Sequence, residues 1–388
     1  EKFFETTWFG NEACFDDLGI TALFVDESHN YKNITMDMKL DNVVGMHTVG
    51  SQKADNMLEK VRFTQQMNGR VIFATGTPLT NSMADLYVIQ KYLQPEELDF
   101  CGISQFSEWI TMFGERETSF EVDVDSQTFR MATRFSRFHN LPELMGMFST
   151  VCDFCQCDVN KELLPKFHGY EEVIVPRSEA QKDFMEIAIE RKNEIRNKET
   201  TVKEDNMLKL MGEIRKCALD IRLVNPDGYD PGEDNKVKFC ARKLKENYDK
   251  YPGTTQLVFC DISVSMPGRP FSVYDELKTE LMSLGIPEDE IAFIHDAKTM
   301  KQRNQLLDDF NEGRVRIMLS TTAKLAEGVN LQKHMKCLHH LDIPWKPSDM
   351  IQREGRLIRP YNENEEVFVY RYITEGTFDS YAWQILEN

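Results

Sequence analysis

The sequence lacks the features that would place the protein in a membrane or outside the cell. No apolar run approaches the roughly 20 residues that a membrane-spanning helix needs. The N-terminal sequence, Glu-Lys-Phe-Phe-Glu-Thr-Thr-Trp, has neither the basic start nor the cleavable apolar core of a signal peptide. The nine cysteines are irregularly spaced, which indicates a reducing compartment rather than a disulfide framework. We therefore expect a cytoplasmic protein with no membrane partner.

Positive charge is also in short supply. Asp and Glu (64) outnumber Lys and Arg (46), and the formal net charge is −18. Binding to nucleic acid depends on neutralising phosphates, so it would need a local basic groove in this acidic chain. With 41% hydrophobic and 28% charged residues, the composition is otherwise that of a globular protein. A chain of 388 residues is long enough for two or three domains, each with its own core.

The most informative stretch is residues 20–29, Ile-Thr-Ala-Leu-Phe-Val-Asp-Glu-Ser-His, in which an apolar run ends in two adjacent carboxylates. The run predicts a strand buried on both faces, as in a parallel sheet. Ligands of such sheets collect at the carboxyl ends of the strands. Two carboxylates there can have separate roles at a phosphate-bound Mg²⁺. One holds the metal through its waters, and the other orients and deprotonates an attacking water.

Strands and helices alternate along the rest of the chain. A strand at 70–75 follows a helix at 54–67, and a helix at 83–93 ends before Pro95. Residues 95–166 show short helical patterns but no clear strand ladder. Further strands are predicted at 171–176, 256–261, 291–294, 315–320, 337–343 and 366–373. Right-handed βαβ connections would make the second sheet mostly parallel, so we expect an α/β fold.

Three more polar segments follow predicted strands or helices. Thr75-Gly-Thr-Pro78 ends one strand, and the segment 320–331, Ser-Thr-Thr-Ala-Lys-Leu-Ala-Glu-Gly-Val-Asn-Leu, ends another. The segment 352–359, Gln-Arg-Glu-Gly-Arg-Leu-Ile-Arg, places Arg356 and Arg359 three residues apart, on one face of an expected helix. Guanidinium groups are always charged and match phosphate oxygens in a fork geometry. Such a pair can stabilise charge on a γ-phosphate.

The four ordered segments 26–29, 75–78, 320–331 and 352–359 resemble motifs II, III, V and VI of superfamily 2 helicases. The resemblance is strongest to the Swi–Snf-type DNA translocases, whose pattern is also similar around Asp85-Leu-Tyr, at Trp345 and over residues 369–377. Ser51-Gln-Lys-Ala and residues 73–83 are similar to helicase segments fused to adenine methyltransferases in phages and conjugative elements. That similarity implies the cytoplasm of a bacterial or phage-infected cell.

The resemblance implies two RecA-like lobes with mostly parallel sheets and a helical insertion. The first lobe would be incomplete at its N-terminus. Residues 1–95 would be the C-terminal part of the first lobe, and residues 96–166 the helical insertion and interlobe connection. Residues 167–235 would begin the second lobe with a helical protrusion, and residues 236–388 would form the second lobe itself.

The resemblance also implies a role for each matching residue, with ATP and Mg²⁺ as cofactors. The second carboxylate of motif II and two arginines of motif VI would be catalytic. The other residues would bind nucleotide, couple the lobes or contact nucleic acid. The catalytic residues would be Glu27, Arg356 and Arg359; the nucleotide-binding residues Asp26 (which also holds Mg²⁺), Gln352 and Gly328; the coupling residues His29, Thr75, Gly76 and Thr77; and the nucleic-acid contacts Ser320, Thr321 and Asn330.

The chain departs from the family pattern in three places. Lys324-Leu-Ala-Glu327 stands where these translocases usually carry a glycine pair, and Ile358 replaces their usual histidine. The sequence also contains no Gly-x-x-x-x-Gly-Lys-Ser/Thr phosphate loop, whose lysine and backbone amides cradle the β- and γ-phosphates. We therefore expect the chain to be a piece of a larger polypeptide and not a complete ATPase by itself.

Two functional classes remain open at this stage. In the first, the parent protein is an ATP-driven motor that moves along double-stranded DNA as its lobes open and close, with motifs II and VI facing each other across the cleft. In the second, hydrolysis is lost and the lobes form a scaffold for DNA or protein. The intact Asp26, Glu27, Arg356 and Arg359 favour the motor. The expected partners are double-stranded DNA and the remainder of the parent chain, for which a DNA methyltransferase is one candidate.

Several other residues admit simpler interpretations. Cys152-x-x-Cys155-x-Cys157, with His168 downstream, has the residue types of a zinc site, but a second cysteine pair at matching spacing is absent. Asn225-Pro-Asp-Gly-Tyr229 differs from the Asn-Pro-Pro-Tyr of adenine methyltransferases and predicts a turn. Arg353 and Arg371 are expected to be surface or strand residues.

Overall fold

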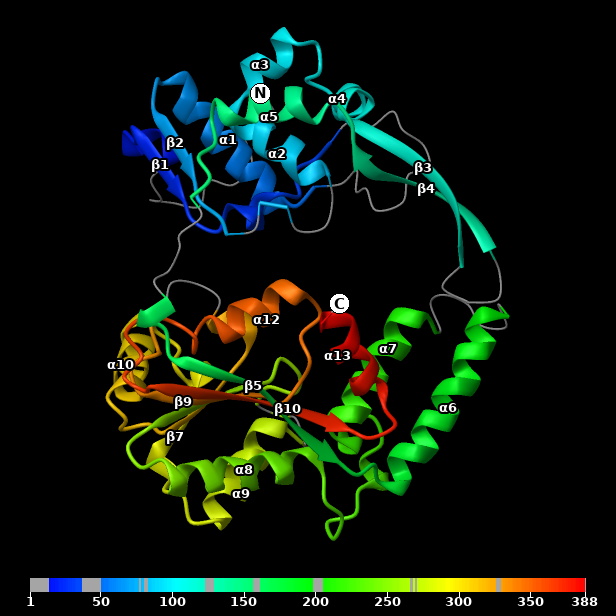
Figure 1. Ribbon diagram of the computed structural model, residues 1–388, viewed down its shortest axis with the longest axis vertical. Coiled ribbons are helices and arrows are strands. Elements are labelled where there is room, and N and C mark those ends of the chain that lie inside the picture. The colour runs from blue at the N-terminus through cyan, green and yellow to red at the C-terminus, as the bar shows by residue number, and fades with distance from the viewer. Residues whose placement is uncertain are drawn as a thin grey trace. The chain divides into compact units, whose positions relative to one another are not determined.

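The computed structural model describes residues 14–36, 50–76, 78–79, 83–122, 129–155, 161–197, 205–265, 268, 271–325 and 329–387 (Figure 1). The chain divides into two compact units, Glu1–Gln156 (unit 1) and Cys157–Asn388 (unit 2). Each unit has its own hydrophobic core. Within the described ranges, no helix is long and apolar enough to cross a membrane.

Unit 1 contains a two-stranded parallel sheet packed against helices. Its strands and helices are β1 Ala22–Val25, α1 Gln52–Gln66, β2 Arg70–Phe73, α2 Ala84–Leu93, α3 Pro95–Phe100, α4 Phe106–Phe113, β3 Gly114–Val122, β4 Phe129–Phe138 and α5 Leu141–Ser149, with 3-10 turns at Phe15–Leu18 and Ser28–Tyr31. Ser51 caps α1 by accepting a hydrogen bond from the Ala54 amide. Pro95 stops α2 and opens α3, since proline fits only the first turn of a helix.

The core of unit 1 is aromatic and lies between α1, α2 and α4. Trp109 is fully buried and its indole N–H donates to Gln90 Oε1 at 2.8 Å. The Tyr92 hydroxyl donates to the carbonyls of Ala54 and Tyr31, so α2 is fastened to α1 and to the turn that follows β1. This core positions the carboxyl ends of β1 and β2.

Two expectations for unit 1 need correction. The first strand was predicted to be buried on both faces, yet Phe24 is 71% exposed and Ile72, its register partner on β2, is 45% exposed. In the described part of the unit, helices cover only the opposite face. The insertion was predicted without a strand ladder, but β3 and β4 form an antiparallel hairpin between α4 and α5 (Figure 1).

Unit 2 is built on a six-stranded sheet of order β5-β10-β9-β6-β8-β7, in which every neighbouring pair is parallel (Figure 1). The strands are β5 Lys166–Val175, β6 Thr255–Phe259, β7 Ile291–Phe293, β8 Ile317–Ser320, β9 Met335–His340 and β10 Glu366–Thr374. The helices are α6 Glu179–Arg196, α7 Met207–Leu219, α8 Lys236–Lys250, α9 Val273–Ser283, α10 Met300–Asn311, α11 Thr322–Leu325, α12 Pro347–Glu354 and α13 Phe378–Glu387.

Helices cover both faces of this sheet, which explains its continuous apolar strands. Val258 of β6 belongs to the core cluster formed with α8 and α9. Its neighbours Leu257 and Phe259 belong to the other cluster, which contains Phe310 of α10 and Leu325 of α11. Alternate residues of one strand thus fill two separate cores, as expected for a parallel sheet with helices on both sides. The predicted α/β fold with a mostly parallel sheet is confirmed for unit 2.

Candidate active site and its supporting network

The two polar segments of unit 1 meet at one edge of its sheet. β1 and β2 run in parallel, with Val25 opposite Phe73. Beyond the strands the pairing continues, because the Ala74 amide donates to Val25 O at 2.9 Å and the Ser28 amide donates to Ala74 O at 3.0 Å. The structure therefore brings the segments 26–29 and 75–76 together.

The two carboxylates follow β1 directly. Asp26 is exposed, and its Oδ1 accepts a hydrogen bond from the Glu27 amide at 2.9 Å. Glu27 has a positive φ of 49°, a left-handed conformation that is costly for a residue with a side chain and is common at functional sites. Two oxygen-donor side chains at the carboxyl edge of a parallel sheet fit a hydrated Mg²⁺, which prefers oxygen ligands.

His29 links the two segments. Its Nδ1 lies 3.0 Å from Thr75 Oγ1 and 3.2 Å from Glu27 Oε2. A proton on Nδ1 would let the ring donate toward the carboxylate and the hydroxyl together. The predicted coupling residues His29 and Thr75 are thus in contact, and Gly76 follows Thr75 at the surface. Thr77 lies outside the described residues.

An ion pair that was not predicted stands beside this edge. Lys32 Nζ lies 3.4 Å from Asp85 Oδ2, and both side chains are more than four-fifths buried. Lys32 ends the turn after β1, and Asp85 lies in the first turn of α2. With His29 and Thr75 these residues line a small pocket. Because the two residues are more than 50 positions apart, local sequence patterns could not predict the pair, although both residues adjoin predicted motifs.

In unit 2 the predicted nucleic-acid contacts lie beyond β8. Ser320 ends the strand and is buried, and its hydroxyl donates to the Thr321 carbonyl at 3.0 Å. Thr321 is partly buried. Asn330 is exposed, and its carbonyl accepts a hydrogen bond from Asn311 Nδ2 of α10. Gly328 lies outside the described residues.

The two arginines of motif VI converge on one acceptor. Arg356 Nη1 donates to the Val329 carbonyl at 2.9 Å, and Arg359 Nη1 donates to the same oxygen at 3.2 Å. They were expected on one face of a helix, but α12 ends at Glu354 and both arginines follow it in a series of turns. Gly355 weakens the helix there, and Pro360 disfavours helical geometry at Arg359. Gln352 is partly buried within α12.

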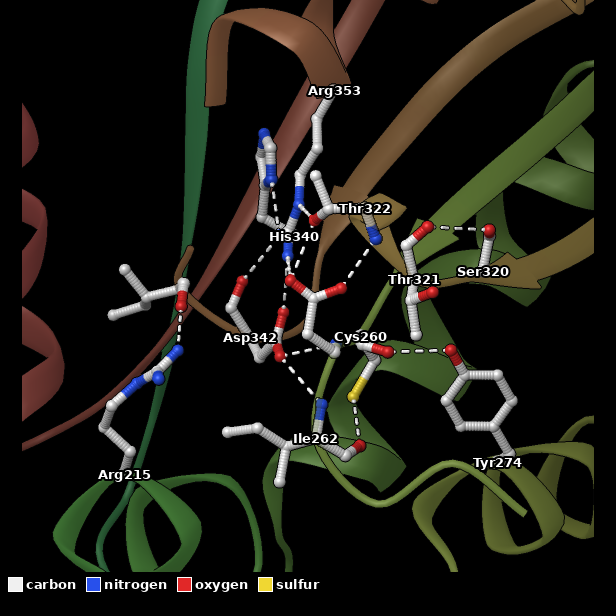
Figure 2. Close-up of polar contacts among 12 residues, drawn as sticks. Arg215, Cys260, Ile262, Tyr274, Ser320, Thr321, Thr322, His340, Asp342 and Arg353 are labelled. Carbon is white, nitrogen blue, oxygen red and sulfur yellow. Dashed lines mark hydrogen bonds and ion pairs between the residues drawn. The ribbon is translucent and has the colours of Figure 1, made fainter. Parts of the chain in front are cut away.

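Arg353 was expected at the surface or in a strand, and this expectation is wrong. Its side chain is fully buried at the end of α12. Its Nε donates to Thr322 Oγ1 at 2.8 Å, and its Nη2 donates to Asp261 Oδ2 at 2.7 Å and Asp342 Oδ1 at 3.0 Å (Figure 2). The reason is geometric, because the last turn of α12 packs directly on the strand ends that carry the two aspartates. Burial raises the pKa of Asp342, and the charge of Arg353 opposes that shift.

A second buried network starts at the neighbouring residue, Glu354. Its Oε1 lies 3.2 Å from His340 Nε2, and its Oε2 accepts a hydrogen bond from the Tyr170 hydroxyl at 2.9 Å. The guanidinium of Arg371 stacks on the Tyr170 ring at 3.3 Å and on Trp383 at 4.4 Å. Arg371 therefore lies in a strand, β10, but is buried rather than exposed.

Two adjacent buried histidines of β9 predict acid sensitivity of unit 2. Burial lowers the pKa of His339 to about 3 and that of His340 to about 4. Below about pH 6.5 the unfolded chain binds protons that the folded chain excludes, so the free energy of unfolding should fall as the pH drops. Each histidine contributes up to about 1.4 kcal/mol per pH unit between roughly pH 6 and its folded pKa.

Urea unfolding of the chain at pH 7.5, 6.5 and 5.5 would measure this loss. His339→Gln keeps a side chain that can bond to Tyr372 and Gln256, the partners of His339, but cannot titrate. We expect this variant to show about half the pH dependence. A free energy of unfolding that stays constant between pH 7 and pH 5 would contradict the assignment.

The remaining candidates are placed as follows. Residues 226–228 form a short 3-10 turn, as predicted for Asn225-Pro-Asp-Gly-Tyr229. Cys152 is partly buried and Cys155 is exposed, whereas Cys157 lies outside the described residues. His168 Nε2 lies 3.1 Å from Glu366 Oε1. Among the residues that the structure describes, the groups close enough to share a metal ion do not include these cysteines.

Comparison with known proteins finds matches to two helicase domain families. Residues 10–156 match the family described as a probable helicase domain, and residues 240–361 match the helicase conserved C-terminal domain. The chain is 37% identical over 79 residues to Defense against restriction protein B of Escherichia phage P1, covering 20% of this chain and 4% of that protein. It is 29% identical over 165 residues to DNA repair protein RAD5 of Candida albicans, covering 41% of this chain and 14% of RAD5.

A longer match extends along nearly the whole chain. The chain is 23% identical over 377 residues to the ISWI chromatin-remodeling complex ATPase ISW1 of Saccharomyces cerevisiae, covering 92% of this chain and 28% of ISW1. Among solved structures, the SWI2/SNF2 ATPase core of Sulfolobus solfataricus in complex with dsDNA is 18% identical with a TM-score of 0.42, covering 94% of this chain and 66% of that chain.

The chain spans 28% or less of the length of each of these curated relatives. Each of its two units contains a helicase family match, and the four ordered segments occur in the same two units. Together with the relatives, these matches confirm the predicted resemblance. The chain resembles the Swi–Snf-type branch of the superfamily 2 helicases.

Proposed function

We propose that the chain is the motor segment of a larger ATP-dependent translocase that moves on double-stranded DNA. The observation that carries the proposal is the joining of segments 26–29 and 75–76 at the carboxyl edge of a parallel sheet, through the contact of His29 with Thr75. Two relatives support it, since one is named as the ATPase of a chromatin-remodeling complex and the other as a DNA repair protein.

Each charged group has a separate task in this proposal. Bound Mg²⁺-ATP supplies the phosphoryl group that water attacks. Asp26 holds the hydrated metal, and Glu27 orients and deprotonates the attacking water. His29 and Thr75 couple the nucleotide state of that site to the other lobe. Arg356 and Arg359 stabilise the charge that develops on the transferred phosphoryl group. In the structure both arginines are held by the Val329 carbonyl, which keeps them side by side.

The link to mobile elements is a second part of the proposal. The similarity to a phage P1 protein named for defense against restriction is in keeping with an origin in phages or conjugative elements. We propose a DNA methyltransferase, joined in the same parent protein, as one partner of the motor. A scaffold without hydrolysis is the competing function, and the turnover measurements below separate the two.

The isolated chain should show no DNA-stimulated ATP hydrolysis above background. The reason is that its sequence has no phosphate loop to hold the β- and γ-phosphates. Steady-state ATPase assays with and without duplex DNA, on residues 1–388 alone, would test this expectation. Turnover that disappears on Glu27→Gln in the isolated chain would show that the phosphates are held by other residues.

DNA binding by the full-length protein should depend steeply on salt and little on sequence. Contacts to the phosphate backbone release counterions, so a protein that contacts about six phosphates loses roughly 10³-fold in affinity between 50 and 200 mM salt. Fluorescence anisotropy with two duplexes of equal length and unrelated sequence would measure both properties. A strong preference for one duplex that persists at high salt would point to a specific binding module instead.

A further inference from the structure

Arg353 joins three neighbouring strand ends of unit 2. Asp261 follows β6, Thr322 follows β8 and Asp342 follows β9, and these strands are adjacent in the order β9-β6-β8. Arg353 uses all of its nitrogens, because its Nη1 also donates to the Asp342 carbonyl at 3.0 Å. The Asp342 carboxylate accepts hydrogen bonds from the Asp261 and Ile262 amides as well (Figure 2).

Thr322 completes the cluster from the side of motif V. Its amide donates to Asp261 Oδ1 at 2.6 Å, and its hydroxyl donates to Asp261 Oδ2 at 2.8 Å. The same hydroxyl oxygen accepts the hydrogen bond from Arg353 Nε (Figure 2). One hydroxyl group thus bridges the guanidinium of motif VI and the carboxylate after β6. We call Asp261, Thr322, Asp342 and Arg353 the strand-end cluster.

The two segments that meet in the contact between the arginines and Val329 both start at this cluster. On one side, the Arg356 amide donates to the Arg353 carbonyl at 3.2 Å, so the turns that carry Arg356 and Arg359 start at Arg353 itself. On the other side, Thr322 opens α11, the helix that precedes Val329 in the chain. A shift of Arg353 relative to Thr322 would therefore move the two arginines relative to their acceptor.

Stability alone is a weak reason for such a cluster. Burying a guanidinium and a carboxylate costs several kcal/mol in desolvation, and apolar side chains of similar volume often stabilise a core as well or better. The planar guanidinium of Arg353, hydrogen-bonded to fixed partners, does hold the surrounding segments in a defined geometry, which apolar packing does not.

We propose that Arg353 is a positioning residue for Arg356 and Arg359, and that it acts through Thr322 and Asp261. The cluster fixes the turns of motif VI against motif V, so that both arginines reach the nucleotide in one arrangement. The inference rests on the proposed function for its effect on turnover, but the arrangement itself can be tested without ATP.

The test uses Thr322→Val, which removes the bridging hydroxyl and leaves the Arg353–Asp342 pair in place. Thr322→Ser keeps the hydroxyl, and Thr279→Val is a matched control because the Thr279 hydroxyl donates only locally to Asp275 O of α9. In the 388-residue chain, native-state hydrogen exchange of the Thr322 and Arg356 amides should become about 10-fold faster in Thr322→Val, the loss expected for one hydrogen bond to a charged group. The other two variants should exchange like the wild type.

In the full-length protein, Thr322→Val should lower kcat about 10-fold and leave the KM for ATP unchanged, with activity restored in Thr322→Ser. Arg353→Lys, which keeps the charge but loses the fork, should behave like Thr322→Val. Wild-type exchange rates in Thr322→Val would overturn the proposal, and so would a lower Tm with unchanged kcat. If the full-length protein hydrolyses no ATP, the proposed function fails, and the exchange rates alone decide the inference.

Discussion

Replacing Arg356 or Arg359 by alanine in the full-length protein should lower ATP turnover by about 10³-fold or more. Arginines that act on a transferred phosphoryl group contribute this much because they neutralise charge that exists only in the transition state. DNA affinity in the absence of nucleotide should stay near the wild-type value, since the proposal gives neither arginine a role in binding DNA. Steady-state ATPase assays and nucleotide-free DNA binding would measure the two properties separately.

The matched control for these variants is Arg314→Ala. Arg314 is half exposed and pairs with Asp309 and Glu312 at the surface of the same unit, so its loss should change little. If either motif VI variant hydrolyses ATP at the wild-type rate while Arg314→Ala does the same, the arginines do not act on the phosphates. Their contact with Val329 would then be purely structural.

Glu27→Gln should abolish turnover in a different way. The amide keeps the size and shape of the carboxylate but cannot accept the proton of the attacking water, so hydrolysis should fall by about 10²-fold to 10⁴-fold. Affinity for Mg²⁺-ATP should persist because Asp26 is unchanged, and the nucleotide-bound state should accumulate. Equilibrium binding of a fluorescent ATP analogue, alongside turnover, would distinguish this loss from that of the arginine variants.

Glu59→Gln provides the control for the acidic variant. Glu59 lies on α1 of the same unit and makes only a long, exposed pair with Arg62, at 3.8 Å. A Glu27→Gln variant that loses nucleotide affinity together with turnover would assign Glu27 to metal binding rather than to activation of water.

The sequence predicted the elements of unit 2 well because its strands are continuous apolar runs bounded by polar residues. Strand β6, for instance, was expected at 256–261 and spans Thr255–Phe259. The hairpin of β3 and β4 was missed because charged residues are scattered along both strands, as in Glu115-Arg116-Glu117, so neither has the apolar run or the regular alternation that marks a strand. The exposure of Phe24 was missed because a local pattern reports how apolar a strand is, not how many of its faces are covered.

Site residues were predictable where a motif follows a strand, and less so where partners come from distant positions. His29 and Thr75 were each predicted to have a coupling role, and the structure places them in contact. Arg353 was misplaced because helical spacing alone does not show which side of a short helix packs on the sheet. A usable signal did exist, since Asp342 follows a buried strand and a buried carboxylate requires a charged or hydrogen-bonding partner, which Arg353 provides.

The order of strands in the second sheet has a consequence for how the protein is made. Strand β5 pairs along its whole length with β10, which lies about 200 residues later in the chain. At the usual rate of synthesis the ribosome needs roughly 10 to 40 s to produce that interval. During this time the edge of β5, including Tyr170 and Ile174, has no native strand to pair with. The nascent chain therefore passes through a stage that is open to aggregation, and chaperone binding to residues 166–175 would shield it.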